Sequence, residues 1–101
     1  MKKINEKQIM KKLYEVLDPE LNISVVDMGF IYHIDVKKDK VNILMTLTTP
    51  GCPLINTIMD DIRQKIKELG FKKNNINIEL TFDPPWSMNM VSKKGKALLG
   101  I

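Results

Sequence analysis

Cys52 is the residue whose type and setting most directly suggest chemistry. It is the single cysteine of the 101-residue chain and follows Thr48, Thr49, a proline and a glycine, with another proline after it. At the start of a helix, the dipole and the free N–H groups of the first turn favour a thiolate. The setting therefore predicts a nucleophilic or metal-binding thiolate, with hydroxyl groups from the two threonines beside the sulfur. The alternative is a small buried residue at a helix start, because free cysteines are often buried.

Four carboxylates and one tryptophan are the other candidates. Asp18, Glu20, Asp27 and Asp83 lie in connecting segments and could ligate a hard or borderline metal. Taken singly, each also fits ordinary turn chemistry, since Asp before Pro often begins a turn. Trp86 follows two prolines, and it either presents an aromatic face to a partner or closes one end of the core.

The apolar spacing predicts six elements in the order α-β-β-α-β-α. A final helix is expected to begin at Ser87 or Asn89 and to continue to about Leu99, weakened by Gly95. The other elements are helices over 5–17 and 53–70 and strands over 30–37, 41–47 and 75–82.

These elements predict a small α/β (α+β) fold with a single domain over residues 1–101. Its three-stranded mixed sheet, with helices packed on it, pairs 30–37 and 41–47 as a hairpin and places the third strand parallel to the second after a crossover helix. The segments 18–29, 48–53 and 83–86 are then expected at one edge of the sheet. A crevice beyond the carboxyl ends of parallel strands is a common ligand site.

Composition excludes several kinds of site. One cysteine cannot form an internal disulfide or supply four thiolates to a cluster, and one histidine, His33 on the polar face of the first strand, cannot build a His-rich zinc site. The chain carries a net charge of +4, but its few aromatic residues are scattered, so nucleic-acid binding is not expected. No transmembrane segment or export signal is expected, which with the free thiol favours the cytoplasm.

Four motifs occur here in the order and at the spacing of a known family: DPEL at 18–21, VDMGFIY at 26–32, MTLTTPGCP at 45–53 and DPPW at 83–86. The chain resembles the iron–sulfur cluster assembly family of SufT/PaaD-like proteins, also called the MIP-eighteen family, and looks closest to its SufT type. The usual Asp-Leu-Gly of this family is Asp-Met-Gly here.

The resemblance implies a role in the maturation of iron–sulfur proteins. The reactive cysteine of the family falls on Cys52, and the acidic and threonine positions around it fall on Asp18, Glu20, Thr48 and Thr49. These five residues are the predicted cofactor-binding positions, with Cys52 as the metal ligand.

The predicted function is an accessory factor, not a catalyst, in iron–sulfur cluster assembly or transfer to client proteins. Because Cys52 is one thiolate, a cluster would be transient or shared between chains, with further ligands from a second subunit, a small thiol or a client. The expected partners are iron–sulfur scaffolds or client apoproteins, contacted through Asp83 and Trp86. A homodimer is a further candidate, because two chains would supply two thiolates.

Three alternatives stay open at this point. The first is a thiol-dependent enzyme with Cys52 as nucleophile, although the one histidine, His33, is expected on the wrong part of the first strand to act as its base. The second is a PaaD-like component that serves a multicomponent oxygenase. The third, a basic nucleic-acid-binding module, would show steep salt dependence.

Overall fold

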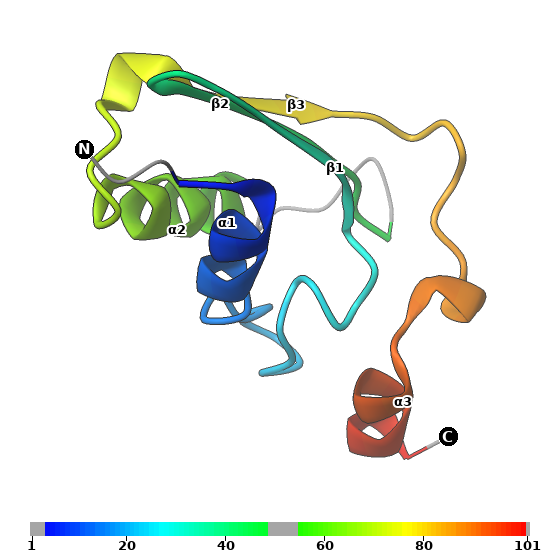
Figure 1. Cartoon of the computed structure of the whole chain (residues 1–101). Helices are drawn as coiled ribbons and strands as arrows, with labels where there is room; N and C mark the ends of the chain where they lie inside the picture. Colours follow the sequence, from blue (N-terminus) through cyan, green and yellow to red (C-terminus); the bar gives the residue numbers. More distant parts are fainter. Residues whose placement is uncertain (1–3, 49–54, 101) are drawn as a thin grey trace.

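The computed structural model describes residues 4–48 and 55–100 of the chain. The order of helices and strands is the predicted one, with two short 3₁₀ turns added (Figure 1). The elements are α1 (Glu6–Leu13), β1 (Ile31–Lys37), β2 (Lys40–Met45), α2 (Ile55–Lys67), η1 (Lys73–Asn75), β3 (Ile76–Leu80), η2 (Met88–Met90) and α3 (Lys93–Leu99).

Helix α1 begins where it was predicted to begin but ends earlier. Asn5 caps it through a reciprocal pair of hydrogen bonds with Gln8, each 2.9 Å long, which is a capping box. The helix ends at Leu13 and not near residue 17. The reason is tertiary: Leu17 forms a β-bridge with Ser24, which requires extended backbone in place of another helical turn.

The sheet has the predicted topology. Strand β2 is central, pairing antiparallel with β1 and parallel with β3. The hairpin turns through Lys38, whose φ of 51° places it in the left-handed region. Both α1 and α2 lie on the same side of the sheet (Figure 1). The other side, called here the outer face, carries the polar half of the alternating strand pattern.

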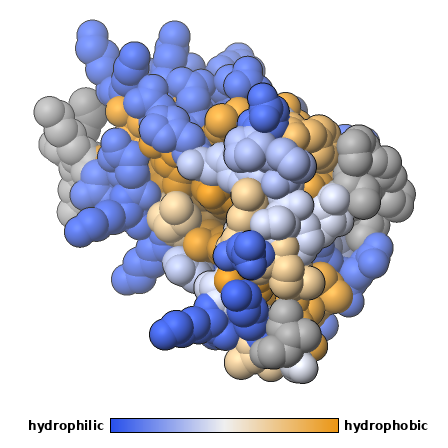
Figure 2. Space-filling model, turned by 90° about the vertical axis from the view of Figure 1, so that its right-hand side faces the viewer, coloured by the Kyte–Doolittle hydropathy of each residue, from blue (hydrophilic) through white to orange (hydrophobic). Residues whose placement is uncertain are grey.

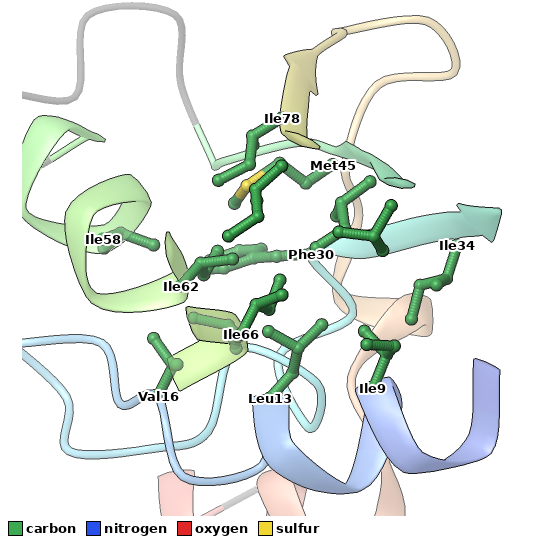
Figure 3. Close-up of a cluster of buried hydrophobic side chains, with 14 of the residues drawn as sticks. Ile9, Leu13, Val16, Phe30, Ile34, Met45, Ile58, Ile62, Ile66 and Ile78 are labelled. Carbon is green, nitrogen blue, oxygen red and sulfur yellow. The ribbon is translucent and has the colours of Figure 1, made fainter. Parts of the chain in front are cut away.

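The core fills the space between the sheet and these two helices. Ile58, Ile62 and Ile66 recur every four residues along α2, and Ile9 and Leu13 project from α1 (Figure 3). All five side chains are completely buried, which stabilises the fold by about 2 kcal/mol each. The helical stripe read from the sequence is therefore confirmed as the surface that holds α2 against the sheet.

The predicted start of the final helix was wrong. Asn89 lies inside η2, and Ser87 precedes η2 without a capping hydrogen bond from its side chain. The cap of α3 is Ser92, whose hydroxyl accepts the Gly95 backbone N–H at 2.9 Å. Gly95 is a packing residue: a Cβ there would lie 2.7 Å from a Val91 methyl carbon and 2.9 Å from the Asp27 carbonyl oxygen.

No helix within 4–48 and 55–100 is both long and apolar enough to cross a membrane.

Candidate functional site

The three strands meet at one end of the sheet, from which the motif-bearing segments leave. The backbone N–H of Thr81 donates to the Met45 carbonyl at 2.8 Å, so β2 and β3 end side by side. The backbone N–H of Thr46 donates to the Phe30 carbonyl at 2.7 Å, which brings the entry to β1 to the same place. The structure thus brings the 26–30 and 83–86 segments together at the end of β2, as the topology predicted.

Trp86 joins two of these segments. Its indole N–H donates to the Met28 carbonyl at 2.6 Å, and its ring meets Phe30 edge to face with centroids 6.1 Å apart. The side chain is partly buried against the core. The hydroxyl of Tyr32 donates to the Pro84 carbonyl at 2.7 Å and fixes the same segment. Trp86 therefore closes one end of the core, and a role in partner binding stays a prediction.

Asp83 is exposed beside this closure. Its backbone forms two local hydrogen bonds with the Thr81 hydroxyl, which accepts the Asp83 N–H at 3.2 Å and is 3.3 Å from its carbonyl oxygen. Within the described residues, the Asp83 carboxylate has no ion pair or hydrogen bond. It is available to solvent or to a partner, and its predicted partner role stays open.

Asp18 and Glu20 lie elsewhere. One Asp18 carboxylate oxygen accepts the N–H groups of Glu20 at 2.8 Å and Leu21 at 3.1 Å, which is the turn chemistry of an Asx motif. The turn sits at the foot of α1, well apart from the segment that follows β3 (Figure 1). The expectation that all the loops converge is therefore wrong for residues 18–22, because the chain needs the rest of its long connection to reach β1.

Asp27 has a structural role that the sequence only half suggested. Its side chain is buried, and its carboxylate accepts the Ser92 hydroxyl at 2.7 Å. Ser92 was missed altogether, because its partner lies 65 residues away. The residues that could have signalled it are Ser92 itself and Gly95, spaced as a cap and the N–H that it binds.

The predicted cofactor positions fall partly outside the described residues. Thr48 is exposed in a bend after β2, whereas Thr49 and Cys52 lie in 49–54, outside the described residues. Within 4–48 and 55–100, no three side chains of His, Cys, Asp or Glu are arranged to hold a metal ion. The described residues thus offer no complete ligand set, and the predicted ligand Cys52 is not among them.

Within the described residues, the ion pairs connect the C-terminal ends of α1 and α2 and the residues that follow these helices. The ammonium of Lys12 is 3.0 Å from the Glu68 carboxylate and 3.6 Å from that of Glu15. The hydrogen bond between Lys12 and Glu68 is the main cause of a raised Lys12 pKa and a lowered Glu68 pKa. Lys65 completes the network at 3.3 Å from Glu15.

A comparison with known protein families matches residues 6–82 to the model described as iron–sulfur cluster assembly protein. This chain belongs to the iron–sulfur cluster assembly family. The match includes three of the four motifs, and ends just before the fourth at 83–86.

Full-length relatives of similar size extend beyond that match. A Porphyromonas gingivalis protein named Fe-S protein maturation auxiliary factor is 40% identical, covering 94% of this chain and 90% of its own length. The factor YitW of Bacillus subtilis, with the same description, is 34% identical and covers 100% of this chain and 99% of its own. The family resemblance therefore includes the C-terminal segment that closes the core.

The fold is also that of solved family structures. A domain of unknown function from Bacillus anthracis superposes with a TM-score of 0.87 at 29% identity, over 95% of this chain and 92% of the other. The small α+β architecture with a three-stranded mixed sheet is thus shared with this solved structure.

Proposed function

We propose that this chain is an accessory factor that assists iron–sulfur cluster assembly or transfer to client proteins, without catalysing a reaction of its own. The observation that carries the proposal is membership of the assembly family over residues 6–82. The names of the full-length relatives, which describe auxiliary maturation factors, support it. In this proposal the chain acts as one unit over residues 1–101, in the reducing cytoplasm, where a free thiol persists.

Cys52 is the proposed ligand for the cluster, which is cargo and not a resident cofactor. In sequence it lies four residues after Thr48 and three before Ile55, the first described residue of α2. Sulfur is the usual ligand of iron in such clusters, and clusters commonly take four thiolates. Since the chain has one cysteine, the remaining ligands come from a second copy, a small thiol or the client.

The other predicted residues take supporting roles in this proposal. Thr48 and Thr49 flank the ligand in sequence, and Asp83 and Trp86 belong to a partner surface at the end of β2 and β3. The exposed carboxylate of Asp83 suits a hydrogen bond to a scaffold or client. Asp18 and Glu20, at the foot of α1, are assigned to the cluster-handling positions on the family resemblance alone.

Maturation of a client tests the proposal. A cell lacking this chain is supplied with the wild type, Cys52→Ser or Ser87→Ala, and the activity of an iron–sulfur enzyme is measured together with its protein level. Ser87→Ala is the matched control, because Ser87 is exposed and its side chain forms no capping bond. The expected result is activity with the wild type and the control and its loss with Cys52→Ser. Full activity with Cys52→Ser would overturn the role of the thiolate.

A further inference from the structure

The outer face of the sheet carries two rows of side chains that cross the strands in register. In the first row His33 of β1 is opposite Leu44 of β2, which is opposite Glu79 of β3. The second row, two residues along, has Asp35, Asn42 and Asn77 in the same strand order. The six side chains line a shared hollow of about 350 Å³. Hydrophilic residues dominate the upper border of the molecule, where the sheet lies (Figure 2).

The polar groups of the first row are not used within the chain. His33 and Glu79 are both exposed, and Leu44 stands between them. In the described part of the chain, neither one has a side-chain hydrogen bond or an ion pair. In this row a half-buried leucine therefore lies between an imidazole on one edge strand and a carboxylate on the other.

We propose that a second copy of this chain packs on the outer face, about a two-fold axis that runs parallel to β2. This rotation places β1 of one chain over β3 of the other and keeps every position along the strands. His33 then faces Glu79 of the partner subunit, and the imidazole N–H donates to the carboxylate. Leu44 faces Leu44 of the partner subunit, so this leucine is covered by its own copy.

The second row is complementary under the same rotation. Asp35 faces Asn77 of the partner subunit, whose amide N–H₂ donates to the carboxylate. Asn42 faces Asn42 of the partner subunit, where each amide offers one donor and one acceptor. Each carboxylate of the two rows therefore faces an imidazole or an amide of the partner subunit and not another carboxylate. This complementarity favours a second copy as the occupant of the outer face.

The other face-to-face arrangement is less suitable. A two-fold axis perpendicular to the strands and midway between the two rows would place Leu44 against Asn42 of the partner subunit. An axis through the first row would instead place Glu79 against Glu79 of the partner subunit, which sets like charges opposite each other. At the hairpin end of the favoured arrangement, Lys40 approaches Lys40 of the partner subunit. The twist of stacked sheets separates strand ends, and a long exposed lysine reaches solvent there.

The geometry points to a weak dimer with a defined polarity. Three strands of five to seven residues offer less area than the roughly 800 Å² per partner of a standard stable interface. Because the axis is parallel to β2, both β2 strands point the same way and both Thr48 residues lie at the same end of the dimer. This inference rests on strand register and does not depend on the proposed function.

Charge exchange tests the interface by sedimentation equilibrium of the purified full-length chain over a range of concentrations. His33→Glu and Glu79→His, measured singly, are expected to weaken dimerisation about threefold or more, because each change alters two symmetry-related exposed pairs. The double variant, His33→Glu with Glu79→His, is expected to return to within about twofold of the wild type, because the pairs are restored in reverse. Gln64→Glu is the control, because Gln64 is exposed on α2, which lies on the opposite side of the sheet from the outer face. It is expected to leave the dimer dissociation constant unchanged.

Leu44→Asp is the second variant, because it buries two carboxylates at the centre of the interface. It is expected to abolish the dimer while the chain keeps its urea midpoint within a small shift. A wild type that stays monomeric at about 1 mM, where even weak contacts are populated, would overturn the proposal. A double exchange variant as weak as the single ones would overturn it as well, since the alternative axis does not pair residues 33 and 79.

Discussion

Ser92 is bound to Asp27 by two hydrogen bonds, from its hydroxyl to the carboxylate at 2.7 Å and from its backbone N–H to the carbonyl at 2.8 Å. Together with the bond from Trp86 to Met28, this contact attaches the segment 83–100 to the turn before β1. That segment lies beyond the residues matched by the family model. The C-terminal part of the chain is therefore held in place by hydrogen bonds to the Asp-Met-Gly motif.

Replacing Ser92 by alanine should weaken the attachment of α3. The change removes the hydroxyl bond to the Asp27 carboxylate and the cap on Gly95, while the backbone N–H bond to the Asp27 carbonyl stays. A lost cap costs about 1 kcal/mol, with a further loss of about 1–2 kcal/mol for the buried carboxylate left unpaired. Urea unfolding and amide hydrogen exchange over 93–99 measure the effect. Ser87→Ala is the matched control and should change the free energy of unfolding by less than about 0.5 kcal/mol.

Equal stability of the Ser92 and Ser87 variants, with unchanged exchange in α3, would show that the contact to Asp27 does not hold this helix.

Gly95→Ala should destabilise the chain although alanine is the better helix former. The added methyl would meet the Asp27 carbonyl oxygen at 2.9 Å and a Val91 methyl carbon at 2.7 Å, and overpacking of this kind costs about 1–3 kcal/mol. Lys94→Ala, exposed on the same helix, is the control and should be neutral. Thermal unfolding compares the two, and a Gly95→Ala chain that melts higher than the wild type would contradict the packing.

Two substitutions of Trp86 separate the contribution of its hydrogen bond to stability from the contribution of its packing. Trp86→Phe keeps an aromatic ring against Phe30 but loses the N–H that binds the Met28 carbonyl, a loss of about 1 kcal/mol. Trp86→Ala loses both and should cost about 3 kcal/mol. Denaturant unfolding of the three chains measures the difference. If the alanine variant is as stable as the wild type, Trp86 does not close the core and is free to serve a partner alone.

The pair Lys12–Glu68 should give the stability of the chain a dependence on pH. The folded pKa of Glu68 is lowered, so its contribution is present above the unfolded value of 4.5 and is lost as pH falls through the folded value. Lys12 has a raised pKa, so its contribution is present below 10.5 and is lost as pH rises through the folded value. Between these limits both charges are present.

Glu68→Gln is therefore expected to be less stable than the wild type at pH 7. At a pH below the folded pKa of Glu68, where this carboxyl is protonated, the two chains are expected to be equally stable. Urea midpoints at the two pH values and at low and high salt measure the effect, because exposed pairs are screened. Glu20→Gln, an exposed carboxylate in the turn at 18–22, is the control. A destabilisation by Glu68→Gln that is the same at both pH values would contradict the pair.

Periodicity predicted the parts of this fold that depend on local pattern. The stripe of Ile58, Ile62 and Ile66 identified α2, and alternation identified the hairpin and the parallel strand. The end of α1 and the cap at Ser92 could not be read this way, because each depends on a contact with a distant segment. The same is true of the 18–22 turn, whose position depends on how the connection to β1 is folded.

The candidate site was predicted by a different kind of reasoning. Topology brought the 26–30 and 83–86 segments to the end of β2, and the structure has them there. The exposure of each side chain, which composition does not give, separates structural from available residues. Asp27 is buried and Trp86 is partly buried, whereas Asp83 and Thr48 are exposed. Cys52 lies outside the described residues, so its role stays a prediction that chemistry must test.

Anaerobic reconstitution with iron and sulfide, comparing the wild type with Cys52→Ser, tests the central claim most directly. Iron and acid-labile sulfide are counted per chain, with sedimentation of the loaded sample to show how many chains share a cluster. The account predicts a cluster on the wild type, held by more than one chain or with an added thiol, and none on the serine variant. Equal iron and sulfide on both chains would contradict the assignment of Cys52 as the cluster ligand.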